Sequence, residues 1–198
     1  MNRASRLAMV AFAALALVGT STAHATTVTK MSLKDLALKS NAVVVARVED
    51  QVARYDANKE IYTYVTLRVL DPVKGSHKDD VITIRQLGGV VDHIASIVPG
   101  MPTFKKGEEV VVFLSQNDKA GYPWIMGLQQ GKYTVSQDQN GTKRVRNELE
   151  GTSLIDASGK AFEPGKTADM PLQALLDGVR TDLDEAGKIQ IDPTVPNE

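Results

Sequence analysis

The sequence predicts a mainly β protein, built as a single antiparallel β-barrel with a short N-terminal helix and an amphipathic C-terminal helix. Three observations predict this fold. Residues 63–69 alternate strictly between two sets of side chains, which is typical of a strand with one buried face. Residues 42–48 and 109–115 are nearly continuous apolar runs, as in strands buried on both faces. A strand over 62–73 would span about 40 Å, and a strand of that length in a small domain is expected to curve into a barrel.

The first 25 residues have the pattern of a secretory signal peptide. Arg3 and Arg6 provide a positive region, residues 7–18 an apolar stretch, and residues 23–25 an A-x-A cleavage site. The apolar stretch is too short to span a bilayer, and no later stretch approaches the roughly 20 residues of a transmembrane helix. We therefore predict export by a bacterial Sec-type route and a mature chain, starting at residue 26, that is periplasmic or secreted.

Composition excludes several classes of protein. The chain has no cysteine, which rules out disulfides, thiolate metal sites and the lipid-bearing cysteine of a lipoprotein. Without Arg3 and Arg6, 21 basic residues face 24 acidic ones, a net charge of −3 with the signs mixed along the chain. Neither nucleic acid nor a membrane surface would find a basic patch to bind. The length fits one domain, expected over residues 26–185, followed by a flexible tail over 186–198.

Helix and strand signals follow one another along the mature chain. Ser32 and Asp35 form a capping-box pair that predicts a short helix. The polar turn 55–60 joins the strand at 42–48 to the long strand at 61–73 as a hairpin. Further strands are expected at 81–87, 109–115, 124–128, 132–136 and 143–146, which gives about seven. Asn140-Gly141 predicts a type I′ turn between the last two.

The chain changes character after residue 150. Asp169 and Pro171 stand where a helix cap and a first-turn proline belong. Apolar residues then recur with helical spacing at Leu172, Leu175, Leu176, Val179 and Leu183. We predict an amphipathic helix with one buried face, ended by Gly187.

The stretch 88–104 is expected to lack regular structure, because glycine and proline interrupt it five times. Loops of this length in compact domains are usually functional or disordered, and this one is too apolar to be disordered. Two roles remain open: a plug that closes the end of the barrel, or a contact surface for a partner. The need of small barrels to close their open ends favours the plug.

Four motifs resemble a family of small exported bacterial proteins: VVVARV at 43–48, TLRVLDPVKG at 66–75, FKKGEEVVVFL at 104–114 and GLQQGKYTV at 127–135. The resemblance implies a leading helix and a closed or nearly closed antiparallel barrel, without an assigned activity. The architecture is also similar to the OB-type barrel of netrin-like modules and tissue metalloproteinase inhibitors. Those inhibitors chelate the target's zinc through an N-terminal cysteine, which this chain lacks. A protease-inhibitor-like module is therefore kept only as an alternative.

Residue patterns that carry catalysis are scarce. The mature chain has two histidines, His77 and His93, and neither belongs to an HExxH motif; there is also no GxSxG elbow. Asp182 and Asp184 begin a spacing similar to a calcium loop, but its fifth and twelfth positions are alanine and proline instead of oxygen ligands. We expect no enzyme activity, no cofactor and no metal site.

Two candidate binding surfaces remain. The first is the apolar part of the long loop, with Val90, Val91, His93, Ile94 and Met101 as candidate contact residues. The second is a strand face on which Tyr62, Tyr64 and Arg68 could stack a ligand as OB-type barrels do, although a covering helix would explain the same residues. We predict an exported, non-enzymatic binding module for an unidentified protein or peptide, with a small-molecule or glycan carrier as the alternative. The oligomeric state does not follow from the sequence.

Overall fold

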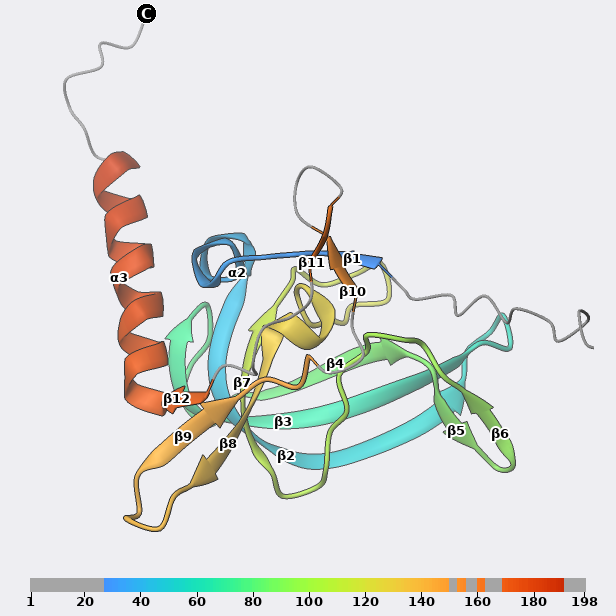
Figure 1. Ribbon diagram of the computed structural model, residues 1–198. Helices are drawn as coiled ribbons and strands as arrows, with labels where there is room; N and C mark the ends of the chain where they lie inside the picture. Colours follow the sequence, from blue (N-terminus) through green and yellow to red (C-terminus); the bar gives the residue numbers. More distant parts are fainter. Residues whose placement is uncertain (1–26, 150–152, 156–159, 163–168, 191–198) are drawn as a thin grey trace, which may run out of the picture.

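The computed structural model describes residues 27–149, 153–155, 160–162 and 169–190, and the predicted signal peptide and residues 191–198 of the predicted tail lie outside this part. A seven-stranded antiparallel sheet in the order β12-β9-β8-β7-β2-β3-β4 forms the centre of the fold (Figure 1). Its strands are β2 (Ala42–Tyr55), β3 (Ile61–Lys74), β4 (Val81–Leu87), β7 (Glu109–Leu114), β8 (Lys132–Gln137), β9 (Lys143–Arg146) and β12 (Asp169–Pro171).

The remaining elements surround this sheet. A three-stranded sheet contains β1 (Thr27–Thr29), β10 (Ser153–Ile155) and β11 (Ala161–Phe162), and a separate hairpin pairs β5 (Gly89–Val91) with β6 (Ile94–Ser96). The helices are α2 (Leu33–Lys39), α3 (Leu172–Gln190) and the 3₁₀ turn η1 (Leu128–Gly131). In Figure 1, α2 and α3 lie at one end of the large sheet and the β5–β6 hairpin projects at the other.

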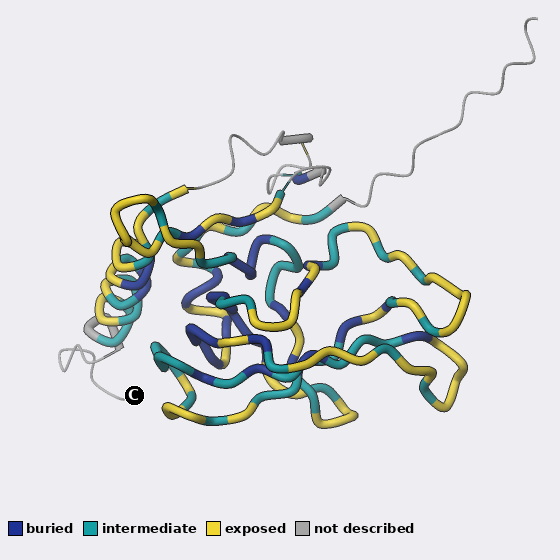
Figure 2. The backbone as a smooth tube through the Cα atoms, turned by 90° about the horizontal axis from the view of Figure 1, so that it is seen from below, coloured by how far each residue is buried: buried dark blue, intermediate teal, exposed yellow. Residues whose placement is uncertain are grey.

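The large sheet buries apolar side chains on both faces. Figure 2 marks the buried residues along the backbone in dark blue. On one face, here called the helix face, residues of α2 and α3 pack against Val43, Val45, Val111, Phe113, Tyr133 and Val145. On the other, the loop face, Phe104 and Ile125 from connecting segments pack against Val44, Val65, Leu67, Val69, Ile84, Val110 and Val112. β2 and β7 are central strands, and both of their faces are covered. As predicted, burial on both faces explains why their sequences are continuously apolar.

Helix α2 is held at both of its ends. The Ser32 hydroxyl accepts from the Asp35 N–H at 3.0 Å, and the Asp35 carboxylate accepts from the Ser32 N–H at 3.2 Å, so the predicted capping box is confirmed. At the C-terminus, Lys74 Nζ of β3 donates to the carbonyl oxygens of Ala37 at 3.0 Å and Ser40 at 2.6 Å. A lysine at this end also favours the helix dipole, so Lys74 fastens α2 to the sheet.

The mainly β class and the large antiparallel sheet are confirmed, but no closed barrel is detected within the described residues. The strand expected at 124–128 is absent. Ile125 makes only an isolated bridge to Leu114, and Gly127 and Leu128 have φ values of 70° and 57°, which extended chains do not adopt. The chain therefore turns into η1 at the place where another strand was expected.

Two further expectations about elements were wrong. Asp169 and Pro171 belong to the edge strand β12, which pairs with β9, and α3 begins only at Leu172. Gly187 does not end α3, which continues to Gln190, so the boundary of the predicted tail at residue 186 was too early. A helix tolerates an interior glycine at a cost of about 1 kcal/mol.

Candidate binding groove

A pocket of about 410 Å³ lies beside the end of β4, and we call it the Trp124 pocket. Most of its wall is apolar and comes from Leu87, Met101, Trp124, Ile125, Met126 and Leu128. Trp124 is 60% exposed, so its large ring lines the pocket while remaining in contact with water. A concave, mostly apolar wall of this size is typical of a ligand site.

The polar groups of the Trp124 pocket are Tyr62, Arg85 and Asp118 together with Gln86. The Arg85 guanidinium lies over the Tyr62 ring, 4.3 Å from its centre, and Arg85 Nη2 donates to Asp118 Oδ2 at 2.8 Å. Burial acts to raise the pKa of Asp118, but the N–H groups of Tyr122 and Ala120 and the Arg85 charge together hold that pKa below its usual range. The carboxylate therefore stays ionised and fixes Arg85 in place.

A second pocket of about 350 Å³, here called the hairpin pocket, adjoins the first. Its lining includes Thr63, Gly89, Val90, Ile97 and Phe104, and it shares Gln86, Leu87 and Met101 with the Trp124 pocket. The two pockets together form what we call the binding groove.

The Gly88-Gly89 pair explains how the β5–β6 hairpin leaves the sheet. At Gly89 (φ 137°) a Cβ atom would lie 2.3 Å from Thr63 Oγ1 and 2.9 Å from Ala53 Cβ, so only glycine fits there. The Thr63 hydroxyl also donates to the Gly88 carbonyl oxygen at 2.8 Å. The base of the hairpin is thereby fixed on β2 and β3, and the expectation that this stretch has no regular structure was wrong.

Beyond this base, the hairpin and the chain after it expose apolar side chains. Val90 is 64% exposed, Ile94 58% and Ile97 85%. His93 is exposed at the turn, next to Asp92 with a φ of 54°. Val91 and Ile94 are paired across the hairpin and lie on one of its faces, whereas Val90 lies on the other. Both faces of the hairpin therefore present apolar groups.

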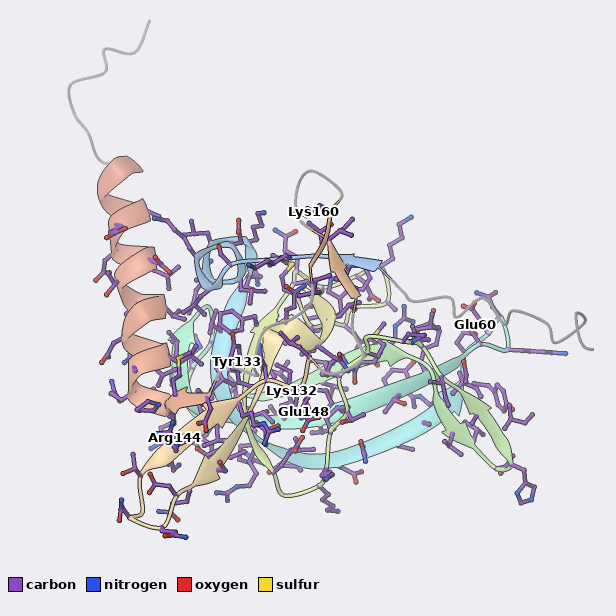
Figure 3. All side chains as sticks on the ribbon, in the orientation of Figure 1. Glu60, Lys132, Tyr133, Arg144, Glu148 and Lys160 are labelled. Carbon is purple, nitrogen blue, oxygen red and sulfur yellow. The ribbon has the colours of Figure 1, made fainter. Side chains whose placement is uncertain are left out.

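Residues of β8 and β4 hold the segment that lines the groove in place. Lys132 of β8, whose side chain is 5% exposed, donates to the Thr103 carbonyl oxygen at 2.6 Å and lies 3.1 Å from Glu108 Oε1 (Figure 3). Its ammonium group is also 5.0 Å from the centre of the Phe104 ring. Gln86 Nε2 donates to the Pro102 carbonyl oxygen at 3.3 Å. The segment that lines the groove is therefore fastened to β8 and β4.

Gln130 fixes the turn that contributes Met126 and Leu128 to the Trp124 pocket. It is buried, its Oε1 accepts from the Met31 N–H at 2.8 Å, and its Nε2 donates to the carbonyl oxygens of Thr29 at 3.0 Å and Gly127 at 3.3 Å. The turn that carries Met126 and Leu128 is thus tied to the start of the described chain.

The structure separates the residues predicted for the two candidate surfaces and regroups them. Tyr62 from the strand face and Met101 from the long loop line the same Trp124 pocket. Tyr64 packs edge-to-face on Tyr122 at 5.2 Å, and Arg68 forms an ion pair with Glu49, so local partners account for both residues. Neither residue belongs to the cluster in which the described helices α2 and α3 pack, so a covering helix does not explain them and that part of the interpretation is corrected.

Sequence reasoning missed Arg85, Asp118 and Trp124. Trp124 was assigned to a strand, although the chain's single tryptophan directly after a proline was a signal for an exposed anchor. Arg85 and Asp118 are 33 positions apart, and no local pattern brings them together.

Other site types find little support in the part of the chain that the structure describes. Both His77 and His93 are exposed, and no group of three or more metal-ligating side chains occurs among the described residues. Neither described helix is both long and apolar enough to cross a membrane. In comparisons with known proteins, no family model and no curated protein matches the chain.

Proposed function

We propose that the protein is an exported, non-enzymatic binding module that holds an apolar segment of a protein or peptide in the binding groove. The observation that carries this proposal is the gathering of exposed apolar side chains around two adjoining pockets: Leu87, Val90, Ile97 and Trp124. Isolated exposed apolar residues are ordinary, but a contiguous set around a concavity marks an interaction site. Ile94 is also exposed, but it lies on the other face of the β5–β6 hairpin from Val90 and lines neither pocket.

The shape of the groove suggests the kind of partner. Pockets joined in a row accept successive side chains of one peptide, and an exposed tryptophan is a common anchor at such interfaces. Arg85 is already neutralised by Asp118, so we propose a partner segment whose contacts are mainly apolar.

A selection from a displayed library of random peptides tests this function. We expect enrichment of peptides with large apolar residues. Trp124→Ser should weaken binding of the selected peptides by roughly 30-fold, the effect of losing about 2 kcal/mol at an interface anchor. Val81→Asp is a matched control, because Val81 is exposed but lines neither pocket of the groove. Peptides that bind native protein and Trp124→Ser equally would contradict the proposal.

One observation favours a second candidate, a carrier of a small apolar molecule. The Trp124 pocket alone has a volume within the range of roughly 300 to 1,000 Å³ that small-molecule sites occupy. Native mass spectrometry of protein purified from its producing cells would then detect a bound compound, and Met101→Trp, which fills the pocket, should remove it. A peptide module without a cargo should have only the mass of the chain.

Export, the resemblance to small exported bacterial barrels and the OB-like character remain parts of this proposal. The antiparallel sheet and the helix that precedes it support the resemblance and the OB-like character. Mass spectrometry of the exported protein should find residue 26 at its N-terminus, and mature protein that retains Met1 would contradict export.

A further inference from the structure

Strand β2 is longer than the neighbour that covers its edge. β7 pairs with β2 from Ala42 to Arg47, and Val48 still exchanges backbone hydrogen bonds with Glu108 and Gly107. Beyond a register shift between Val48 and Asp50, β2 pairs with β3 alone as far as Tyr55. Residues 50–55 therefore form a free edge of the large sheet, judged from the strands that the structure describes.

The hydrogen-bond pattern identifies which groups this edge offers. The Asp56 N–H donates to the Glu60 carbonyl oxygen at 2.8 Å, which makes this pair a hydrogen-bonded one. Since such pairs alternate along an antiparallel ladder, Arg54 and Val52 bond to β3. Gln51 and Ala53 consequently point their N–H and C=O groups away from β3, toward the free side.

The side chains along the edge alternate in a self-complementary way. Asp50, Val52 and Arg54 lie opposite Thr66, Tyr64 and Tyr62 of β3, so all three are on the helix face. The first is an acid, the second apolar and the third a base. Exposed edge strands normally carry charges that prevent pairing. Here the two signs are placed symmetrically about Val52.

We propose that a second copy of this chain pairs with the free edge of β2, antiparallel and with the two-fold axis at Val52. In this register Gln51 of each copy lies opposite Ala53 of the other, which gives four backbone hydrogen bonds. Each Asp50 lies opposite an Arg54, and the two Val52 side chains meet on the axis. Two large sheets thereby join into one continuous sheet across an isologous interface.

Neighbouring registers are disfavoured by charge. A shift that centres the axis on Ala53 places Asp50 opposite Asp56, and one that centres it on Arg54 places two arginines opposite each other. The edge of β4 is a poorer alternative, because the Arg85 N–H at its middle already donates to the Pro123 carbonyl oxygen at 3.2 Å. The backbone hydrogen bond of Arg85 therefore disfavours the β4 edge, and charge complementarity selects the register on β2.

A cysteine cross-link tests the register directly, since the chain has no cysteine of its own. Val52 faces its copy in a non-hydrogen-bonded pair, where Cα atoms are about 4.5 Å apart, within the range of a disulfide. We expect V52C to form a covalent dimer rapidly under mild oxidation. V81C is the matched control, because Val81 is 54% exposed and Val52 52%. Equal cross-linking of the two variants would overturn the proposal.

Charge reversal provides an independent test that does not depend on a new bond. Asp50→Arg should weaken dimerisation in sedimentation equilibrium by about tenfold, because it places two pairs of arginines opposite each other. Adding Arg54→Asp should restore dimerisation to within about threefold of the native chain. Asp184→Arg, an exposed reversal on α3, should change nothing. A native chain that stays monomeric at millimolar concentration would overturn the proposal and leave the edge to a strand of another protein.

Discussion

The two ends of the large sheet differ in what covers them, although β2 and β3 run through both. At one end α2 and α3 bury the helix face and connecting segments bury the loop face. At the other end none of the described helices covers the helix face, and the loop face holds the hairpin pocket. Among the described residues, most of the exposed large apolar side chains lie at this open end: Val52, Tyr55, Leu87, Val90, Ile94, Ile97 and Trp124.

Strand alternation and burial are therefore separate properties of this sheet. Tyr62 and Tyr64 alternate with Val65 as regularly as Val43 alternates with Val44. At the helix end both sets of side chains are buried, whereas at the open end one set packs on arginines and on a loop tyrosine without becoming buried. Apolar side chains that stay exposed are the feature that marks the open end as a candidate for binding.

The largest expected effect is at the helix end. Leu176 of α3 is 3% exposed and packs in the helix-face core. Leu176→Ala should lower the free energy of unfolding by about 2 to 5 kcal/mol, because it leaves a cavity as well as removing apolar contact. Urea denaturation measures this. An unchanged midpoint would mean that α3 contributes nothing to the fold, and the comparison of the two ends would fail.

Lys132 tests whether the groove is rigid despite being open. Lys132→Ala leaves Glu108 and the Thr103 carbonyl oxygen without their partner in a nearly dry site. Removing one member of a buried pair typically costs about 3 kcal/mol or more, which corresponds to a fall in Tm of roughly 6 to 12 °C. Lys143→Ala is a control, because the Lys143 side chain, which pairs with Glu109, is 51% exposed. Equal small effects in both variants would mean that Lys132 does not fasten the groove.

A smaller effect is expected from Asp35 in the capping box. Hydrogen bonds from the Ser32 hydroxyl and N–H, together with Lys39, lower the pKa of Asp35 to about 2. A depressed pKa in the folded state gives stability that is complete above the ordinary value of 3.8 and is lost as the pH falls through about 2. Thermal melts between pH 5 and pH 2 should therefore decline less steeply for Asp35→Asn than for the native chain. Parallel curves would contradict the assigned cause.

Much of the fold could be predicted because its signals are local. The Ser32 cap, the 55–60 turn and the apolar runs of β2 and β7 are each visible within a few residues. Local signals failed where tertiary contacts decide. Pro171 looked like a first helical residue but pairs in β12, and only Gly141 of the Asn140-Gly141 turn has a positive φ, so the hairpin is present without the type I′ turn.

The candidate groove was harder to predict than the fold. Three predicted residues, Tyr62, Val90 and Met101, line it, but Tyr62 had been assigned to a competing hypothesis, because the sequence does not reveal that β3 and the long loop meet. The glycines at 88 and 89 were interpreted as breakers of regular structure. They instead permit a close contact of the β5–β6 hairpin with Thr63 and Ala53. Positive φ values and close approaches of this kind have no periodicity to detect.

Ile94 and Ile97 decide whether the apolar side chains of the open end form an exposed surface for a partner or a plug. Ile94→Asp and Ile97→Asp place a charge at exposed positions, so each should leave Tm within about 1 to 2 °C of the native value. If these residues close the end of the molecule instead, the buried charge should lower stability by a few kcal/mol. A fall in Tm of more than roughly 5 °C in calorimetry would contradict the account.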